Sequence, residues 1–138
     1  MGVTMRDKLY VFVAGLGLFA TGVPLAAHHS FNAEFDASKP VTLTGTVTKV
    51  EWVNPHVRFD VDVKDELGTV TSWKLELGPP NVLIRLGWTR NSLKPGDIVT
   101  VEGSLAKDGS KLANARKVTL SDGRKVFAGS AADGEKKE

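Results

Sequence analysis

The segment at residues 57–64 constrains the fold more than any other part of this chain. Its side chains alternate without interruption, with apolar Val57, Phe59, Val61 and Val63 on one face and charged Arg58, Asp60, Asp62 and Lys64 on the other. Strict alternation is typical of a β-strand that buries one face. Asn54 and Pro55 end the preceding apolar run, because proline fixes φ and has no amide hydrogen to donate to a sheet. The pattern predicts a turn followed by a strand, with His56 at the mouth of the hairpin.

The N-terminal stretch has the organisation of a secretory signal peptide. Arg6 and Lys8 form a short basic region, residues 9–20 form an apolar run, and small residues lead up to Ala27. A membrane-spanning helix needs roughly 20 apolar residues, and this run is shorter and contains two glycines. We expect cleavage after Ala27, a periplasmic or secreted mature protein, and no membrane span after cleavage. The alternative is an uncleaved N-terminal anchor.

The remaining chain divides by composition into an arm, a domain and a tail. The polar arm carries Phe31 and Phe35, which either share one face of a helical turn or dock separately, in both cases as anchors over the open end of a barrel. From Gly129 onward no apolar residue is larger than alanine, which is typical of a disordered tail. The expected segments are a signal peptide at 1–27, an N-terminal arm at 28–40, a domain at 41–128 and a tail at 129–138.

Strand and helix signals follow one another through the expected domain. In the first strand, at 41–53, the apolar side chains change parity near Thr48, which predicts a β-bulge and a bend. A third strand at 70–77 carries Trp73, which we expect in the core. Prolines at its start and a glycine at its end predict a short helix at 79–87, and Trp88 after it is expected to plug the barrel. Further strands are expected at 98–103, 113–120 and 125–127.

This order of elements predicts the fold class. Three strands, a short helix and two further strands follow the order of an OB-fold. We therefore expect an all-β protein with little helix: a five-stranded OB-fold-like β-barrel with a short helix between strands 3 and 4. An open meander and an SH3-like barrel are the alternatives, and neither easily accommodates the helix at 79–87.

Several short motifs are distributed over the expected mature chain. They are AHHSF at 27–31, EFD at 34–36, WVNPH at 52–56, GWTRNSLKPGD at 87–97 and DGRK at 122–125. Together they resemble a family of small exported bacterial proteins classed as a domain of unknown function. The resemblance implies an exported small β-barrel, and it implies no reaction.

Composition excludes several kinds of site. The chain has no cysteine, and its two methionines, Met1 and Met5, lie in the expected signal peptide. The mature protein can therefore have no disulfide, thiolate metal site or thioether copper(I) site. Acidic and basic residues are nearly balanced after cleavage, and the outward row of the strand at 57–64 has no aromatic residue. We expect no nucleic-acid partner, because such partners require net positive charge and stacking surfaces.

The three histidines, His28, His29 and His56, are the candidate metal ligands. Cleavage after Ala27 makes His28 the N-terminal residue, so its α-amine and imidazole can chelate one ion. Copper(II) favours such tetragonal nitrogen ligands, and His29 or His56 can complete the plane. The alternative is that these histidines are cleavage-site and turn residues with no metal role.

No catalytic constellation is apparent in the sequence. Asp60 and Asp62 share a strand face with opposite charges, which is typical of a solvated surface rather than an acid–base pair. The serines have no nucleophile-elbow context, and the isolated glycines form no phosphate loop. We expect a non-enzymatic, exported OB-fold binding module, with copper(II) as the leading ligand. The alternative is a structural or protein-interaction barrel of the cell envelope, with an unknown envelope protein as partner and no metal.

Overall fold

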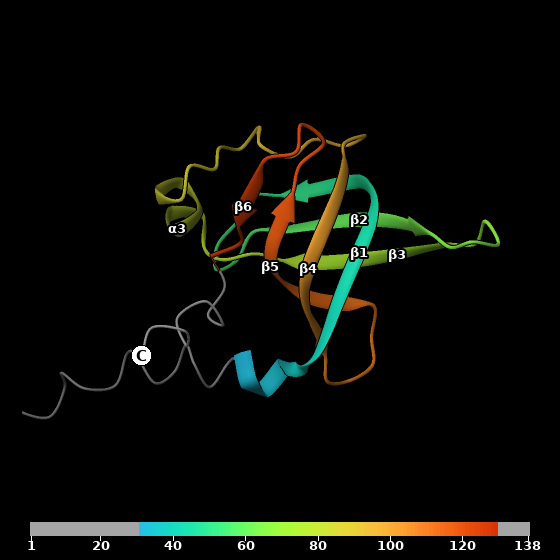
Figure 1. Ribbon diagram of the computed structural model, residues 1–138. Coiled ribbons are helices and arrows are strands. Elements are labelled where there is room, and N and C mark those ends of the chain that lie inside the picture. The colour runs from blue at the N-terminus through green and yellow to red at the C-terminus, as the bar shows by residue number, and fades with distance from the viewer. Residues whose placement is uncertain (1–30, 130–138) are drawn as a thin grey trace, which may run out of the picture.

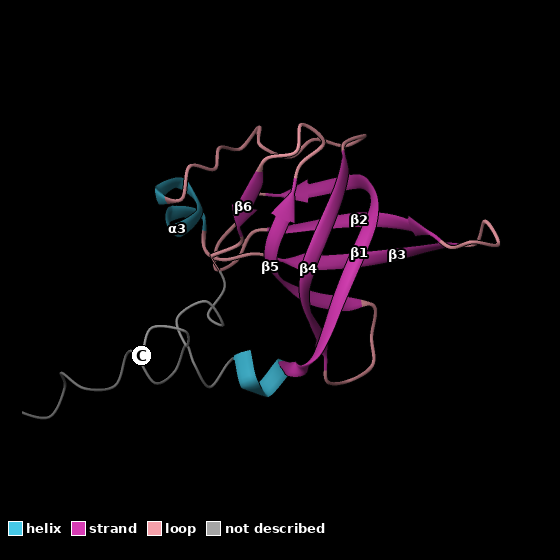
Figure 2. Ribbon diagram, in the orientation of Figure 1, coloured by secondary structure: helices cyan, strands magenta, loops and turns pink. Residues whose placement is uncertain are grey.

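The computed structural model describes residues 31–129, whose strands form one sheet that closes into a ring (Figure 1). Almost all of its regular structure is strand (Figure 2). The elements are β1 (Phe35–Glu51), β2 (Arg58–Lys64), β3 (Val70–Glu76), α3 (Pro80–Arg85), β4 (Ile98–Ala106), β5 (Leu112–Thr119) and β6 (Lys125–Phe127). The order across the sheet is β3-β2-β1-β4-β5-β6, and a parallel pairing of β3 with β5 closes the ring. The predicted all-β class and the OB-like order of elements are confirmed.

The long first strand belongs to both halves of the ring. β1 pairs with β4 from Phe35 to Thr46 and with β2 from Thr46 onward. The register shifts between Val47 and Lys49, which confirms the predicted bulge. Near this bend Gly45 lies against β2, where an added Cβ would be 2.5 Å from the carbonyl oxygen of Asp62. A glycine is therefore required for the close approach of the two strands.

The predicted bounds of the first strand, 41–53, are wrong at both ends. β1 begins at Phe35, which pairs with Ala106 of β4, and the register then shifts before Pro40. The polar residues in this irregular stretch show no alternation, so the pattern could not indicate pairing there. At the other end β1 stops at Glu51, before the cis peptide bond between Asn54 and Pro55.

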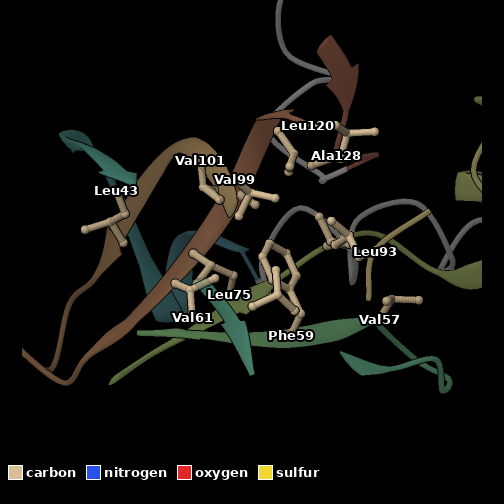
Figure 3. Packing of buried hydrophobic residues seen from close by; sticks show 14 of the residues in the cluster. Leu43, Val57, Phe59, Val61, Leu75, Leu93, Val99, Val101, Leu120 and Ala128 are labelled. Atoms are coloured by element: carbon tan, nitrogen blue, oxygen red, sulfur yellow. The ribbon is translucent and has the colours of Figure 1, made fainter. Parts of the chain in front are cut away.

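The core fills the inside of the ring (Figure 3). Its fully buried side chains come from every strand of the ring and include Val47, Phe59, Val61, Leu75, Val99, Val101 and Val118. Leu83 of α3 and Trp88 complete the core and are also buried, which confirms the predicted helix and the predicted plug. Burial of these side chains is the main favourable contribution to folding.

Trp73 corrects one expectation about the core. Its indole is only partly buried and packs at the edge of the core, with the Lys111 ammonium 5.1 Å from the ring centroid. The pairing of β3 with β5 begins at Lys74, one residue later. The ammonium of Lys111, the residue just before β5, therefore contacts the ring at this edge of the core.

The two aromatic residues of the N-terminal arm form a second, separate cluster. Residues 31–34 are helical and Phe35 is the first residue of β1. The rings of Phe31 and Phe35 lie 5.6 Å apart and pack with Ala106 and Leu112. Figure 1 shows the helical turn below the sheet, at the lower end of β1.

Within residues 31–129, none of the helices is long and apolar enough to cross a membrane.

Candidate functional site

A cleft of about 500 Å³ lies between the β1–β2 connection and α3 with the loop that follows it. We call it the tryptophan cleft. It is lined by Trp52, Val53, Asn54, Pro80, Asn81, Ile84, Trp88, Thr89 and Arg90. Its volume falls within the range of roughly 300–1,000 Å³ that is usual for small-molecule sites.

Local sequence shapes the helical wall of this cleft. Pro80 occupies the first turn of α3, where a missing amide hydrogen costs nothing. Gly87 ends the helix with φ at +94°, a conformation that glycine adopts without strain. The chain then turns back, so that the amide of Trp88 donates to the carbonyl of Leu83 at 2.9 Å. The indole of Trp88 is thereby held beneath the helix, 3% exposed.

The loop after Trp88 is fixed by its own side chains. The amide of Thr89 donates to Oγ of Ser92 at 2.8 Å, and the amide of Asn91 donates to Oγ1 of Thr89 at 3.2 Å. Such side-chain to backbone hydrogen bonds define the conformation of a short turn. Arg90, between these residues, is consequently carried on an ordered turn at the rim of the cleft.

The walls of the cleft combine exposed apolar surface with polar groups. Val53 is 50% exposed and Ile84 is 60% exposed, which makes them two of the few large apolar side chains of the described chain that face solvent. No aspartate or glutamate is among the lining residues, and Arg90 takes part in none of the ion pairs of residues 31–129. The cleft therefore offers an apolar surface beside an uncompensated positive charge.

A polar cluster surrounds the buried carboxylate of Glu76. Two of its members, His56 and Arg58, follow the cleft residue Asn54 closely in the chain. Nδ1 of His56 lies 3.2 Å from Oε1 of Glu76, and a guanidinium nitrogen of Arg58 lies 3.2 Å from Oε2. The Glu76 side chain is 6% exposed, whereas that of His56 is 33% exposed. The ring therefore contacts Glu76 through Nδ1, and Nε2 is its remaining donor or acceptor atom.

Comparison with known proteins gives a family and no activity. A family of unknown function, DUF6152, matches residues 16–115. The chain belongs to this family. The matched residues include every residue that lines the tryptophan cleft, and the predicted resemblance to a family of unknown function is confirmed. No curated protein matches the chain.

Among solved structures, the chain is similar to the mitochondrial single-stranded DNA-binding protein Rim1 of S. cerevisiae. The two sequences are 10% identical, and the TM-score is 0.48 over 60% of this chain and 93% of that chain. At this level of similarity the match carries no argument about function.

The predicted metal ligands are only partly described by the structure. His28 and His29 lie outside residues 31–129, so the three-histidine site stays a prediction, and His56 lies where the hairpin prediction put it. Within the described residues no group of three or more histidine, aspartate or glutamate side chains is placed to hold a metal ion.

Asp60 and Asp62 lie on the outer face of β2, as predicted. Asp60 is ion-paired with Lys74 at 2.9 Å, and Ser72 donates a hydrogen bond to Asp62. Together with the pair of Arg58 and Glu76, these contacts form a ladder across β2 and β3, and with Lys64 the face carries three positive and three negative side chains. The outer face of β2 and β3 is therefore a structural surface and not an acid–base pair.

Sequence reasoning missed Glu76 and the cleft. Glu76 falls on the outward row of its strand, so alternation predicts an exposed side chain; the adjacent strand β5, with Asn114 opposite Glu76, removes it from water. The available signal for the cleft was that two of the quoted motifs, WVNPH and GWTRN, each contain a tryptophan beside polar residues. Only the fold brings these motifs together.

Proposed function

We propose that the mature protein is an exported, non-enzymatic binding module whose ligand site is the tryptophan cleft. The observation that carries this proposal is the convergence of WVNPH and GWTRN on one cleft, although the motifs lie far apart in the chain. Concave, largely apolar sites with a few polar groups are the usual form of small-molecule sites.

The chemistry of the cleft supports binding without reaction. Among its lining residues there is no imidazole, carboxylate, thiol or amine that could serve as a general base or nucleophile. The one hydroxyl, on Thr89, already accepts a hydrogen bond from the amide of Asn91. A nucleic-acid partner is not part of the proposal, because the outer face of β2 and β3 is charge-balanced.

The ligand site can be tested by a fragment screen with ¹H–¹⁵N correlation spectra of the mature protein. We expect binding fragments to shift the indole N–H signal of Trp52 and the amides of Val53, Asn81 and Arg90. The indole of Trp73, which does not line the cleft, is the internal control and should not move. Shifts confined to surfaces away from the cleft, or no binder at all, would refute the cleft as ligand site.

Export rests on the N-terminal pattern and has its own test. Residues 1–27 have the three parts of a secretory signal peptide, with cleavage expected after Ala27. Intact mass of the protein recovered from the periplasm should correspond to a chain that begins at His28. A product that retains Met1 would overturn the export proposal and every argument about His28.

Copper(II) is a second candidate ligand, and the contact between His56 and Glu76 favours it. Histidines that bind metals commonly have a carboxylate beside their other ring nitrogen, and Oε1 of Glu76 lies 3.2 Å from Nδ1 of His56. Leu112 packs against the cluster of Phe31, Phe35 and Ala106 and pairs with Lys74, two residues before Glu76 on β3. In this proposal the α-amine and imidazole of His28 form the primary chelate, and His29 or His56 completes the plane.

Copper titrations of four samples test this second proposal: the mature protein, the same protein with one added N-terminal residue, the His56→Ala variant, and a free peptide of residues 28–35. We expect tight binding of one ion by the mature protein, falling as the pH drops because the ligands must be deprotonated. The added residue and His56→Ala should both weaken binding.

Equal affinity of peptide and protein, with no effect of His56→Ala, would show that the fold does not build a copper site. A chain cleaved one residue early would begin Ala27-His28-His29 and bind copper(II) without the barrel, and intact mass distinguishes that case. If both the cleft screen and the copper titrations fail, a structural or protein-interaction barrel of the envelope is the remaining interpretation.

A further inference from the structure

We infer that the tryptophan cleft takes a small organic anion with a flat apolar body and one carboxylate, and that Arg90 binds the carboxylate. This inference rests on the proposed function, since it specifies the ligand of the same cleft. It is carried by the charge of the lining residues, by the exposed apolar walls and by the ordered turn that carries Arg90.

The charge of the cleft selects an anion. Arg90 is the only charged residue among those that line it, and no carboxylate of the described chain lies within ion-pair distance of its guanidinium. A guanidinium presents a planar fork of donors that matches a carboxylate with two parallel hydrogen bonds. One such group beside an apolar wall suits a monoanion.

The apolar walls select a flat body. Trp52, Val53 and Ile84 present apolar surface to the cleft, and the latter two are half exposed or more. Covering such a patch gains free energy in proportion to the area removed from water. An indole face also favours an aromatic partner through stacking or edge-to-face contact. The volume of about 500 Å³ limits the ligand to a small molecule.

The rim is preorganised for a polar contact. Hydrogen bonds from Thr89 to Ser92 and from Asn91 to Thr89 fix the turn that carries Arg90. Binding therefore need not order this loop, which lowers the entropic cost of association. The exposed amides of Asn54 and Asn81, which also line the cleft, add donors and acceptors that can orient the ligand.

A matched pair of probes tests the anion. Indole-3-acetate and indole-3-acetamide share the same ring and side-chain length and differ by one charge. We expect the mature protein to bind indole-3-acetate about tenfold or more tightly than the amide, because a charge-assisted bidentate contact is worth about that factor or more. Dissociation constants come from shifts of the Trp52 indole N–H and neighbouring amides.

Arginine variants then locate the interaction. Arg90→Gln should reduce the preference for the anion to about one, because it removes the charge that pairs with the carboxylate. Arg85→Gln is the matched control, because Arg85 is also exposed and lies on α3 but does not line the cleft. It should keep the preference. Both side chains are exposed, so the spectra of both variants should show the native fold.

The possible outcomes test separately whether the cleft is a ligand site and whether its ligand is an anion bound by Arg90. Equal affinity for anion and amide, with shifts in the cleft, would overturn the anion inference and leave the cleft as the ligand site. A preference for the anion that survives Arg90→Gln would overturn the role of Arg90. The absence of cleft shifts with both probes would overturn the anion inference, and the broader fragment screen would then decide whether the cleft binds any ligand.

Discussion

Val61 and Asp62 are neighbours on β2 whose side chains point to opposite faces of the sheet. Val61 is fully buried in the core, and the carboxylate of Asp62 accepts a hydrogen bond from Ser72 on the outer face. We expect Val61→Ala to lower the free energy of unfolding by about 1–3 kcal/mol, because it removes buried methyl groups and leaves a cavity. Asp62→Ala should change it by less than about 0.5 kcal/mol. Urea unfolding of both variants checks the order, and the reverse order would mean that the strand faces are exchanged.

Glu76 is the only buried carboxylate of the described residues, and it is held by two partners of different kinds. Glu76→Gln keeps the shape of the side chain but weakens the contacts to His56 and Arg58. We expect a loss of about 1–3 kcal/mol in the free energy of unfolding, the usual range for hydrogen bonds to charged groups.

The pair of Asp60 and Lys74 is the matched control for Glu76. It spans the same two strands at 2.9 Å, but both side chains are more exposed, at 28% and 42%. Asp60→Asn should therefore cost no more than about 1 kcal/mol. If urea unfolding shows equal losses in the free energy of unfolding for Glu76→Gln and Asp60→Asn, burial does not increase the contribution of Glu76 to stability.

At the scale of elements, β4 and β5 are joined by a cross-strand ion pair that makes stability depend on pH. Glu102 and Lys117 are opposite each other, and Nζ of Lys117 lies 2.8 Å from the Glu102 carboxylate. The hydrogen bond from Lys117 holds the pKa of Glu102 below its ordinary value of 4.5. A lowered carboxylate pKa stabilises the fold above the ordinary value, and this contribution is lost as the pH falls through the lowered one.

We therefore expect the wild-type chain to be more stable than Glu102→Gln at neutral pH, with the difference shrinking as the pH falls below 4.5. The effect should be small, because both side chains are partly exposed. Urea unfolding over a pH series gives the difference. In a Lys117→Gln background the same substitution should give a nearly constant difference, and a slope that persists there would assign the effect to another group.

At the scale of the whole molecule, the C-terminal segment ties the ring to the start of the helical wall. The amide of Gly78 donates to the carbonyl of Ala128 at 2.7 Å, and the amide of Ala128 donates to the carbonyl of Arg116 at 2.9 Å. The side chain of Ala128 is fully buried. Gly78 is needed here, since an added Cβ would be 2.1 Å from the carbonyl oxygen of Gly129.

A chain that ends at Leu120 should consequently lose about 2 kcal/mol or more of stability, because it lacks β6 and both of these hydrogen bonds. A chain that ends at Gly129 is the control, since it keeps every contact described above and should unfold at the wild-type urea concentration. Two truncations of equal stability would show that the C-terminal segment does not hold the ring together.

The sequence by itself determined the elements whose signals are local. Alternation at 57–64 placed β2, a change of apolar parity near Thr48 placed the bulge of β1, and prolines and a glycine bounded α3. Each of these signals depends only on residues close together in the chain. Backbone geometry and side-chain period dictate them before any tertiary contact forms.

Tertiary structure alone decided the burial of Glu76, the position of Trp73 at the edge of the core, and the tryptophan cleft. All three depend on contacts between segments far apart in the chain: the parallel pairing of β3 with β5, and the approach of the β1–β2 connection to α3. Alternation along a strand shows which residues share a face, but it cannot show which neighbour covers that face. The candidate site lies where those neighbours meet, and for that reason no local pattern could locate it.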